Sequence, residues 1–169
     1  IDTKLNRYVA VKVVDTPYRD DESYNTRFAR EAQALARLQH TNITNVYRFG
    51  SAADVFYIAM QYIEGSDLDT MINRFRGDGL FIEYDDILRI NQHVCEALDY
   101  MHQQDIVHRD IKPSNVMLDT SGNAIITDFG LVLLRDEGTR GETFGSPQYI
   151  APEQAISSAG AVPQSDLYS

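Results

Sequence analysis

The spacing of apolar and polar residues predicts strands for most of the first third of the chain. Residues 8–14 alternate and are rich in β-branched side chains, which is typical of a strand. Residues 26–39 carry apolar side chains at helical spacing and predict a helix with one apolar stripe. Two more strands are expected near 45–49 and 55–62, joined by a hairpin loop at 51–54.

The pattern then changes to helical spacing. Residues 65–67 interrupt the preceding strand pattern, and Ser66 or Asp67 can cap a short helix that ends at 77–79. Residues 84–103 predict the strongest helix, because their apolar positions recur at steps of three and four and acidic side chains occupy the first turn. These features predict a helical second part.

Short strands are expected near 116–118 and 124–127, and residues 130–163 are expected to be a long connection of low regularity. A strand-rich first third followed by a mostly helical remainder predicts an α+β fold with two lobes and a hinge near 62–66. The predicted division is residues 1–62 for the smaller lobe and residues 63–169 for the larger lobe.

Composition narrows the possible partners. The 169 residues are 43% apolar, enough for a buried core, and the net charge of −10 disfavours nucleic acid or anionic lipid as a partner. A single cysteine, Cys95, excludes an internal disulfide and a multi-cysteine zinc site; on the long helix it is expected to be buried. No apolar stretch is long enough to cross a bilayer. A cytoplasmic location is expected, with no membrane contact in this segment, although an anchor elsewhere in a longer protein would be compatible with it.

The residues that carry chemistry gather in residues 108–115 and at one later carboxylate. Asp110, Lys112 and Asn115 supply an acid, an ammonium group and an amide, and Asp128 follows thirteen residues after Asn115. Phosphoryl transfer needs these groups: a carboxylate orients the attacking hydroxyl, a cation neutralises charge, and hard oxygen atoms hold magnesium.

Five short blocks carry a family resemblance: Val9–Lys12, His108–Asn115, Asp128–Gly130, Gly145–Tyr149 and Ala151–Glu153. In their order and spacing they resemble the blocks of protein kinases, with His108–Asn115 as the catalytic loop, and the resemblance covers essentially the whole chain. Lys112, two residues after the aspartate of that loop, resembles the serine/threonine branch rather than the tyrosine branch. Residues 145–155 resemble bacterial serine/threonine kinases.

The resemblance implies an ATP-dependent kinase that phosphorylates Ser or Thr hydroxyls of protein substrates. Asp110 would then orient the substrate hydroxyl and act as the catalytic base, and Lys112 would contact the γ-phosphate. Asn115 and Asp128 would hold Mg²⁺. The two-lobed kinase fold is expected to be incomplete at both ends of this chain.

The resemblance also implies a nucleotide site. Lys12 would grip the α- and β-phosphates, with Glu31 as its helix partner. Met60 would be the gatekeeper, and the backbone of Gln61 and Ile63 would bond the adenine edge. The remaining contacts implied are Ala10 and Met117, on the two faces of the ring, and Asp67 at the ribose.

Regulation by phosphorylation is implied by Arg109, which precedes the catalytic aspartate and in related kinases pairs with a phosphate of the activation loop. Thr139 and Thr143 are the candidate phosphorylation sites. Ser146 is expected to bond the Asp110–Lys112 pair instead.

Parts of the family pattern are not in this sequence. The Gly-rich loop would precede Lys12 by about twenty residues, and the helices that follow Asp166 in the family are missing, so the chain is expected to be a fragment. Glu153 is expected to lack a partner, because in the family its partner is an arginine that follows Asp166.

Two alternatives differ in class. A pseudokinase or scaffold would bind partners without catalysis, and a degenerate Gly-rich loop upstream would favour it. A small-molecule kinase of related fold, such as an aminoglycoside phosphotransferase, usually has Asp-x-Asp in place of Asp128–Gly130 and lacks the Ala151–Glu153 block.

Overall fold

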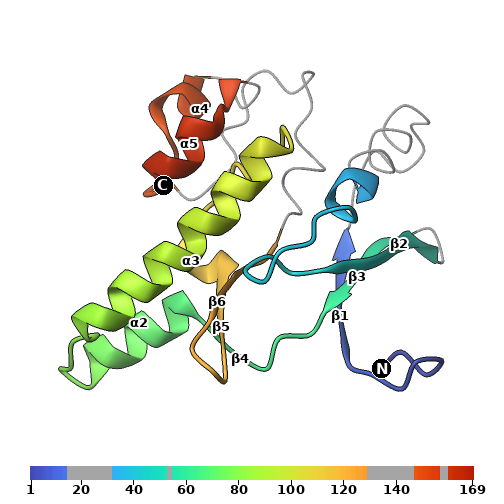
Figure 1. Ribbon diagram of the computed structural model, residues 1–169, viewed down its shortest axis with the longest axis horizontal. Coiled ribbons are helices and arrows are strands. Elements are labelled where there is room, and N and C mark those ends of the chain that lie inside the picture. The colour runs from blue at the N-terminus through green and yellow to red at the C-terminus, as the bar shows by residue number, and fades with distance from the viewer. Residues whose placement is uncertain (15–31, 53–54, 129–146, 157–159) are drawn as a thin grey trace.

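A three-stranded antiparallel sheet forms the N-terminal part of the computed structural model, which describes residues 1–14, 32–52, 55–128, 147–156 and 160–169 (Figure 1). Its strands lie in the order β1-β3-β2, with bounds β1 (Val9–Val14), β2 (Val46–Ala52) and β3 (Val55–Gln61). The alternating pattern fits this arrangement because β3 lies in the middle and buries Ile58, which is 3% exposed. The register pairs Lys12 directly with Ile58.

A second antiparallel sheet and the helices make up the rest. The sheet has the order β4-β5-β6 and is overlain by the long helix α3, with α2 beside one end of α3 and α4 and α5 near the other (Figure 1). The bounds are β4 (Gly65–Asp67), α2 (Leu68–Gly77), α3 (Tyr84–Gln103), the 3-10 turn η1 (Pro113–Asn115), β5 (Val116–Asp119), β6 (Ala124–Ile126), α4 (Pro152–Ile156) and α5 (Pro163–Tyr168).

The two principal helices begin and end where the sequence predicts. Asp67 caps α2, because its Oδ1 accepts a hydrogen bond from the backbone N–H of Thr70 at 2.8 Å. Helix α3 buries a stripe that includes Ile90, Leu98 and Met101. No helix in the described ranges is both long and apolar enough to cross a membrane.

Residues 42–44, which follow the helical residues 32–35, join the two sheets. The N–H of Thr44 donates to Ile126 O at 2.9 Å, and the N–H of Ile126 donates to Asn42 O at 2.8 Å. The Asn42 side chain adds a bond to Ala124 O at 2.8 Å. One apolar cluster spans both parts as a result, with Leu35 and Ile58 from the first and Leu98, Met101 and Ile126 from the second.

The predicted helix 26–39 ends earlier than expected. Residues 32–35 are helical, and the chain then tightens into a turn in which the N–H of Leu38 bonds Leu35 O at 3.1 Å. The periodicity was misleading here because Leu38 is buried in the core although it has left the helix. The start of this helix, including Glu31, lies outside the described residues.

Other boundaries also need correction. The predicted hairpin loop is shorter, because Ser51 and Ala52 belong to β2 and pair with β3. Residues 65–67, expected to be a break, form β4 by pairing with β5. The predicted connection of low regularity, residues 130–163, contains α4, and α5 begins at its last residue. Cys95 is exposed and not buried.

Candidate active site

The catalytic-loop carboxylate Asp110 is nearly buried and has two side-chain neighbours. Its Oδ2 lies 3.0 Å from Lys112 Nζ and accepts a hydrogen bond of 3.0 Å from Asn115 Nδ2. Asn115 reaches back because the 3-10 turn η1 reverses the chain, and Nδ2 also donates to Asp110 O at 2.7 Å. Among the described residues, both of these side-chain contacts are made by Oδ2.

Thr127 ties the second carboxylate, Asp128, to this loop. The N–H of Thr127 donates to Asn115 O at 2.9 Å, and its hydroxyl donates to the same oxygen at 3.2 Å. Asp128 itself has a φ of +67°, an uncommon left-handed conformation for a residue other than glycine. Its Oδ1 contacts Lys12 Nζ of β1. The fold thus joins residues 12, 115 and 128 across more than a hundred positions.

His108 is buried between these two segments. Its Nε2 lies 3.1 Å from Thr127 O, and its Nδ1 accepts the N–H of Asp110 at 3.3 Å. Burial lowers the pKa of His108, while the charges of Asp166, Asp110 and Asp128 and the bond to Thr127 oppose this effect. A neutral ring that donates from Nε2 and accepts at Nδ1 satisfies both bonds.

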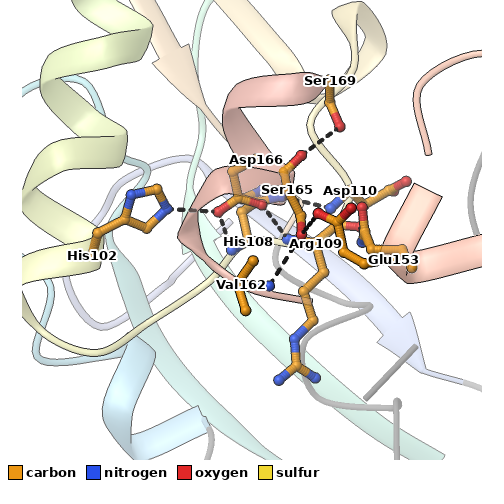
Figure 2. A network of polar contacts seen from close by, with 10 residues as sticks. His102, His108, Arg109, Asp110, Glu153, Val162, Ser165, Asp166 and Ser169 are labelled. Atoms are coloured by element: carbon orange, nitrogen blue, oxygen red, sulfur yellow. Dashed lines mark hydrogen bonds and ion pairs between the residues drawn. The ribbon is translucent and has the colours of Figure 1, made fainter. Parts of the chain in front are cut away.

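Asp166, in α5, holds the backbone that leads into the catalytic loop (Figure 2). Its Oδ2 accepts from the N–H of His108 at 2.8 Å and lies 2.8 Å from His102 Nε2. Its Oδ1 accepts from the N–H of Arg109 at 2.7 Å. The carboxylate is completely buried, and Arg109 has a φ of +68°.

Glu153 has a partner, contrary to expectation. The Ser165 hydroxyl donates to Glu153 Oε1 at 2.5 Å, and this bond lowers the pKa of Glu153 (Figure 2). The same hydroxyl accepts the N–H of Val162 at 3.1 Å. The expectation was wrong because it considered the family's arginine alone, whereas the first turn of α5 supplies a donor.

Two residues of the predicted nucleotide site are neighbours in the first sheet. Ala10 of β1 pairs directly with Met60 of β3, so both point to the same face. Gln61 follows Met60, and Asn45 holds both its main chain and its side chain: the N–H of Gln61 bonds Asn45 O, and its Oε1 accepts Asn45 Nδ2, each at 2.9 Å. This clamp fixes the end of β3.

Two further residues of the predicted nucleotide site are neighbours in the second sheet. Asp67 of β4 pairs with Met117 of β5. Ile63, in the segment of chain that connects β3 to β4, is buried. Thr70 occupies both carboxylate oxygens of Asp67, with bonds of 2.8 Å from its N–H and 2.7 Å from its hydroxyl. The backbone bond and then the hydroxyl bond lower the pKa of Asp67. A contact of Asp67 with ribose stays a prediction.

The residues present can accommodate a divalent metal. Asn115 uses Nδ2 for both of its bonds to Asp110, which makes its Oδ1 the atom suited to a cation. The Asp128 carboxylate is 43% exposed and reachable. A carboxylate and an amide oxygen are donors suited to a hard divalent cation.

Four of the predicted site residues lie outside the described part of the chain. Four residues that hold the site together were not predicted from the sequence. Glu31, Thr139, Thr143 and Ser146 fall outside the described part. The residues missed are in loops and helix ends, where no periodicity marks them; they are Asp166, His102, Thr127 and Gln154, whose Nε2 donates to Arg109 O at 3.0 Å.

Relatives of the chain are bacterial protein kinases. It is 38% identical over 170 residues to the serine/threonine-protein kinase PrkC of Bacillus subtilis, covering 99% of this chain and 26% of the relative. It is 39% identical over 158 residues to a probable serine/threonine-protein kinase of Clostridium acetobutylicum, covering 92% of this chain and 23% of that relative. The chain therefore spans about a quarter of the length of these curated relatives.

A solved structure confirms the fold class. The crystal structure of the Mycobacterium tuberculosis PknI kinase domain matches with a TM-score of 0.71 and 32% identity, over 95% of this chain and 59% of that one. The fold is thus α+β and that of a kinase domain, as the sequence predicted. The sequence model for the protein kinase domain matches residues 1–169, and with this match over its whole length the chain belongs to the protein kinase domain family.

Proposed function

We propose that this chain is the catalytic part of an ATP-dependent serine/threonine protein kinase that transfers the γ-phosphoryl group of ATP to Ser or Thr hydroxyls of proteins. The observation that carries the proposal is the continuous set of contacts from Lys12 to Asp128, through Thr127 to Asn115, and on to Asp110 and Lys112. These are the groups that phosphoryl transfer requires, and they meet at one place.

Protein kinases in general use ATP and a divalent metal, and we propose Mg²⁺ as the metal here. When bound, the ion would neutralise negative charge on the phosphates. Asn115 and Asp128 are the residues that would hold it. Lys12 would turn from Asp128 to the α- and β-phosphates, with Glu31 as its predicted partner.

The adenine and ribose contacts belong to the same proposal. Ala10, Met60 and Met117 would surround the ring, the backbone of residues 61 and 63 would bond its edge, and Asp67 would reach the ribose. The pairing of Ala10 with Met60 and the clamp on Gln61 support a preformed site for the ring.

In the proposed reaction Asp110 orients the substrate hydroxyl and accepts its proton at Oδ1. Lys112 stays next to Asp110 Oδ2 and brings positive charge to the γ-phosphate. The bond from Asn115 keeps the carboxylate from rotating. Holding the groups in place before the substrate arrives lowers the reorganisation needed in the transition state.

Control and location are also proposed. Arg109 would pair with a phosphate on Thr139 or Thr143, and Ser146 would bond the Asp110–Lys112 pair. A cytoplasmic location is favoured by the use of ATP and by a chain with one cysteine and no possible internal disulfide. Protein substrates are the proposed partners.

The test uses the full-length protein that carries this sequence, incubated with ATP and Mg²⁺. We expect phosphate on Ser and Thr by mass spectrometry, and we expect Asp110→Asn to lower the transfer rate by about 10³-fold because the base is lost. Asp99→Asn, at an exposed acid of α3 that contacts Gln103, is the matched control and should leave the rate unchanged.

Two results would contradict the proposal. Transfer by Asp110→Asn within about tenfold of the parent would remove Asp110 from the role of base. A parent protein that binds nucleotide but transfers no phosphate would instead identify a pseudokinase.

A further inference from the structure

Gln61, the last residue of β3, is bonded through both its backbone and its side chain to Asn45, which lies just before β2. The N–H of Gln61 donates to Asn45 O at 2.9 Å. Gln61 Oε1 accepts Asn45 Nδ2 at 2.9 Å and the N–H of Asn45 at the longer distance of 3.4 Å. Because a backbone N–H can only donate, the Gln61 atom that faces it is the amide oxygen, and the Asn45 atom that faces this oxygen is the amide nitrogen. The pair therefore requires an acceptor on side chain 61 and a donor on side chain 45.

Asn45 follows a buried segment that is bonded to the second sheet. Asn42 and Thr44 are 5% and 1% exposed. The N–H of Thr44 donates to Ile126 O at 2.9 Å, and the N–H of Ile126 donates to Asn42 O at 2.8 Å. Ile126 is the last residue of β6 and lies two positions before Asp128. The bonds of Asn45 thus connect the end of β3 to the strand that leads to Asp128.

The end of β3 is where the proposed nucleotide site meets the edge of adenine. Met60 lies beside Ala10 in the sheet, and the carbonyl oxygen of the next residue, Gln61, would accept the 6-amino group of the ring. The N–H of Gln61 is already used by the bond to Asn45, so the carbonyl oxygen is the backbone group left for adenine. A group that is held in place before its ligand arrives binds that ligand at a lower cost in conformational entropy.

We propose that Asn45 is a positioning residue for adenine: its bonds to Gln61 hold the Gln61 carbonyl oxygen where the 6-amino group of the ring binds, and so favour adenine over purines that lack this group. This inference rests on the proposed kinase function. It adds to that function a residue that acts through Gln61, and a reason for the selection of one base.

Binding of two diphosphates to the full-length protein, with Mg²⁺ present, tests this role. ADP carries the 6-amino group, and purine riboside 5′-diphosphate is the same molecule without it. The variant is Gln61→Met, whose side chain has about the same length but cannot accept the bond from Asn45. By calorimetry we expect Kd for ADP to rise about five- to tenfold and Kd for the purine riboside diphosphate to change by less than about twofold.

Two further variants separate the hydrogen bond from the other contacts of the side chain. Gln61→Glu keeps an acceptor that faces both donors of Asn45, so we expect its Kd for ADP to stay within about twofold of the parent value. Asn45→Leu removes the side-chain donor and should weaken ADP binding as much as Gln61→Met does. The double variant, with Asn45→Leu and Gln61→Met together, should lose no more than either single variant, because both substitutions remove the same bond.

Kinetics with ATP give a second measurement. We expect Gln61→Met to raise KM for ATP by about five- to tenfold and to keep kcat within about twofold, because the pair acts on nucleotide binding and not on the base Asp110. The matched control is Gln103→Met, the same substitution at an exposed residue of α3 whose amide donates to Asp99 Oδ2 at 2.8 Å. It should leave KM and kcat unchanged. Each variant is measured at a temperature where it is folded, with thermal unfolding recorded alongside.

Several outcomes would overturn the inference. They are an unchanged Kd for ADP in Gln61→Met, an equal weakening of both diphosphates, an equal loss in Gln61→Glu and Gln61→Met, additive losses in the double variant, and a Gln61→Met protein that does not fold, which would make the pair structural. Failure of the proposed function would look different, because the parent protein would then bind ADP and transfer no phosphate from ATP.

Discussion

The two carboxylates of the candidate active site are held in very different ways. Asp110 has a side chain that is 7% exposed and contacts Lys112 and Asn115, while Asp166 holds the backbone N–H groups of the two preceding residues, His108 and Arg109. Asp128 has a side chain that is 43% exposed and contacts Lys12, itself 33% exposed. One acid is held by a buried network. The other is reachable and, among the residues that the structure describes, pairs with Lys12 in a partly exposed contact.

This difference fits two tasks. A base must be aimed at its substrate in advance, and buried hydrogen bonds in a low dielectric are strong enough to do so. A residue that is to exchange a lysine for a metal must release that lysine cheaply, and exposed ion pairs contribute only about 0–1 kcal/mol. If the proposed roles hold, the rigid acid would be the base on the catalytic-loop side and the exchangeable one would serve the phosphates.

Removing the buried anchor should have the largest effect. Asp166→Ala leaves the N–H groups of His108 and Arg109 and the ring of His102 without their acceptor, so we expect the free energy of unfolding to fall by about 3–5 kcal/mol. Urea denaturation measures this change. Asp99→Ala, an exposed acid of α3, should change stability by less than about 0.5 kcal/mol. Equal effects of the two substitutions would remove the distinction between the regions.

Removing Lys12 from its ion pair with Asp128 should affect the reaction strongly and the stability little. We expect Lys12→Met to lower kcat/KM by about 10²-fold, because a cation for the phosphates is lost. The same change should alter the free energy of unfolding by less than about 1 kcal/mol. Kinetics and urea denaturation on one preparation test both parts, with Lys4→Met as the control at an exposed lysine. A stability loss as large as that of Asp166→Ala would show that the pair is structural.

A smaller effect should appear in the pH dependence of stability. Burial lowers the pKa of His108 below its ordinary value of 6.5, so the unfolded chain takes up a proton at a higher pH than the folded chain does. The contribution of His108 is therefore complete above pH 6.5 and is lost as the pH falls from there through the lowered pKa. Unfolding in urea between about pH 5.5 and 7.5 measures it. The decline should be weaker in His108→Phe, and an unchanged decline would contradict the argument.

Long periodic segments were predictable without the fold. Helix α3 runs from Tyr84 to Gln103 as its spacing predicts, since a stripe repeated over five turns leaves little choice of structure. The cap at Asp67 was likewise a local matter, because its partner Thr70 is three residues away. Strand β4 was missed because Gly65–Asp67 has no strand pattern of its own and becomes a strand by pairing with β5.

The kinase chemistry could be recognised from its motifs, but the supports of the site could not. Asp110, Lys112, Asn115 and Asp128 belong to short motifs that identify the family, and their catalytic roles stay predictions. His102 was one of several scattered histidines with no distinguishing neighbour in the sequence. Its importance follows from a contact with a residue 64 positions later.

The amino-acid sequence by itself determined which reactive groups are present and which segments become long helices and regular strands, because both depend on side-chain chemistry and on neighbours within a few turns. The tertiary structure decided how those groups are held: which acid is buried, which is exposed, and which backbone is kept in a left-handed conformation. Burial and hydrogen bonds between distant segments exist only once the chain is packed, since they depend on which surfaces exclude water together.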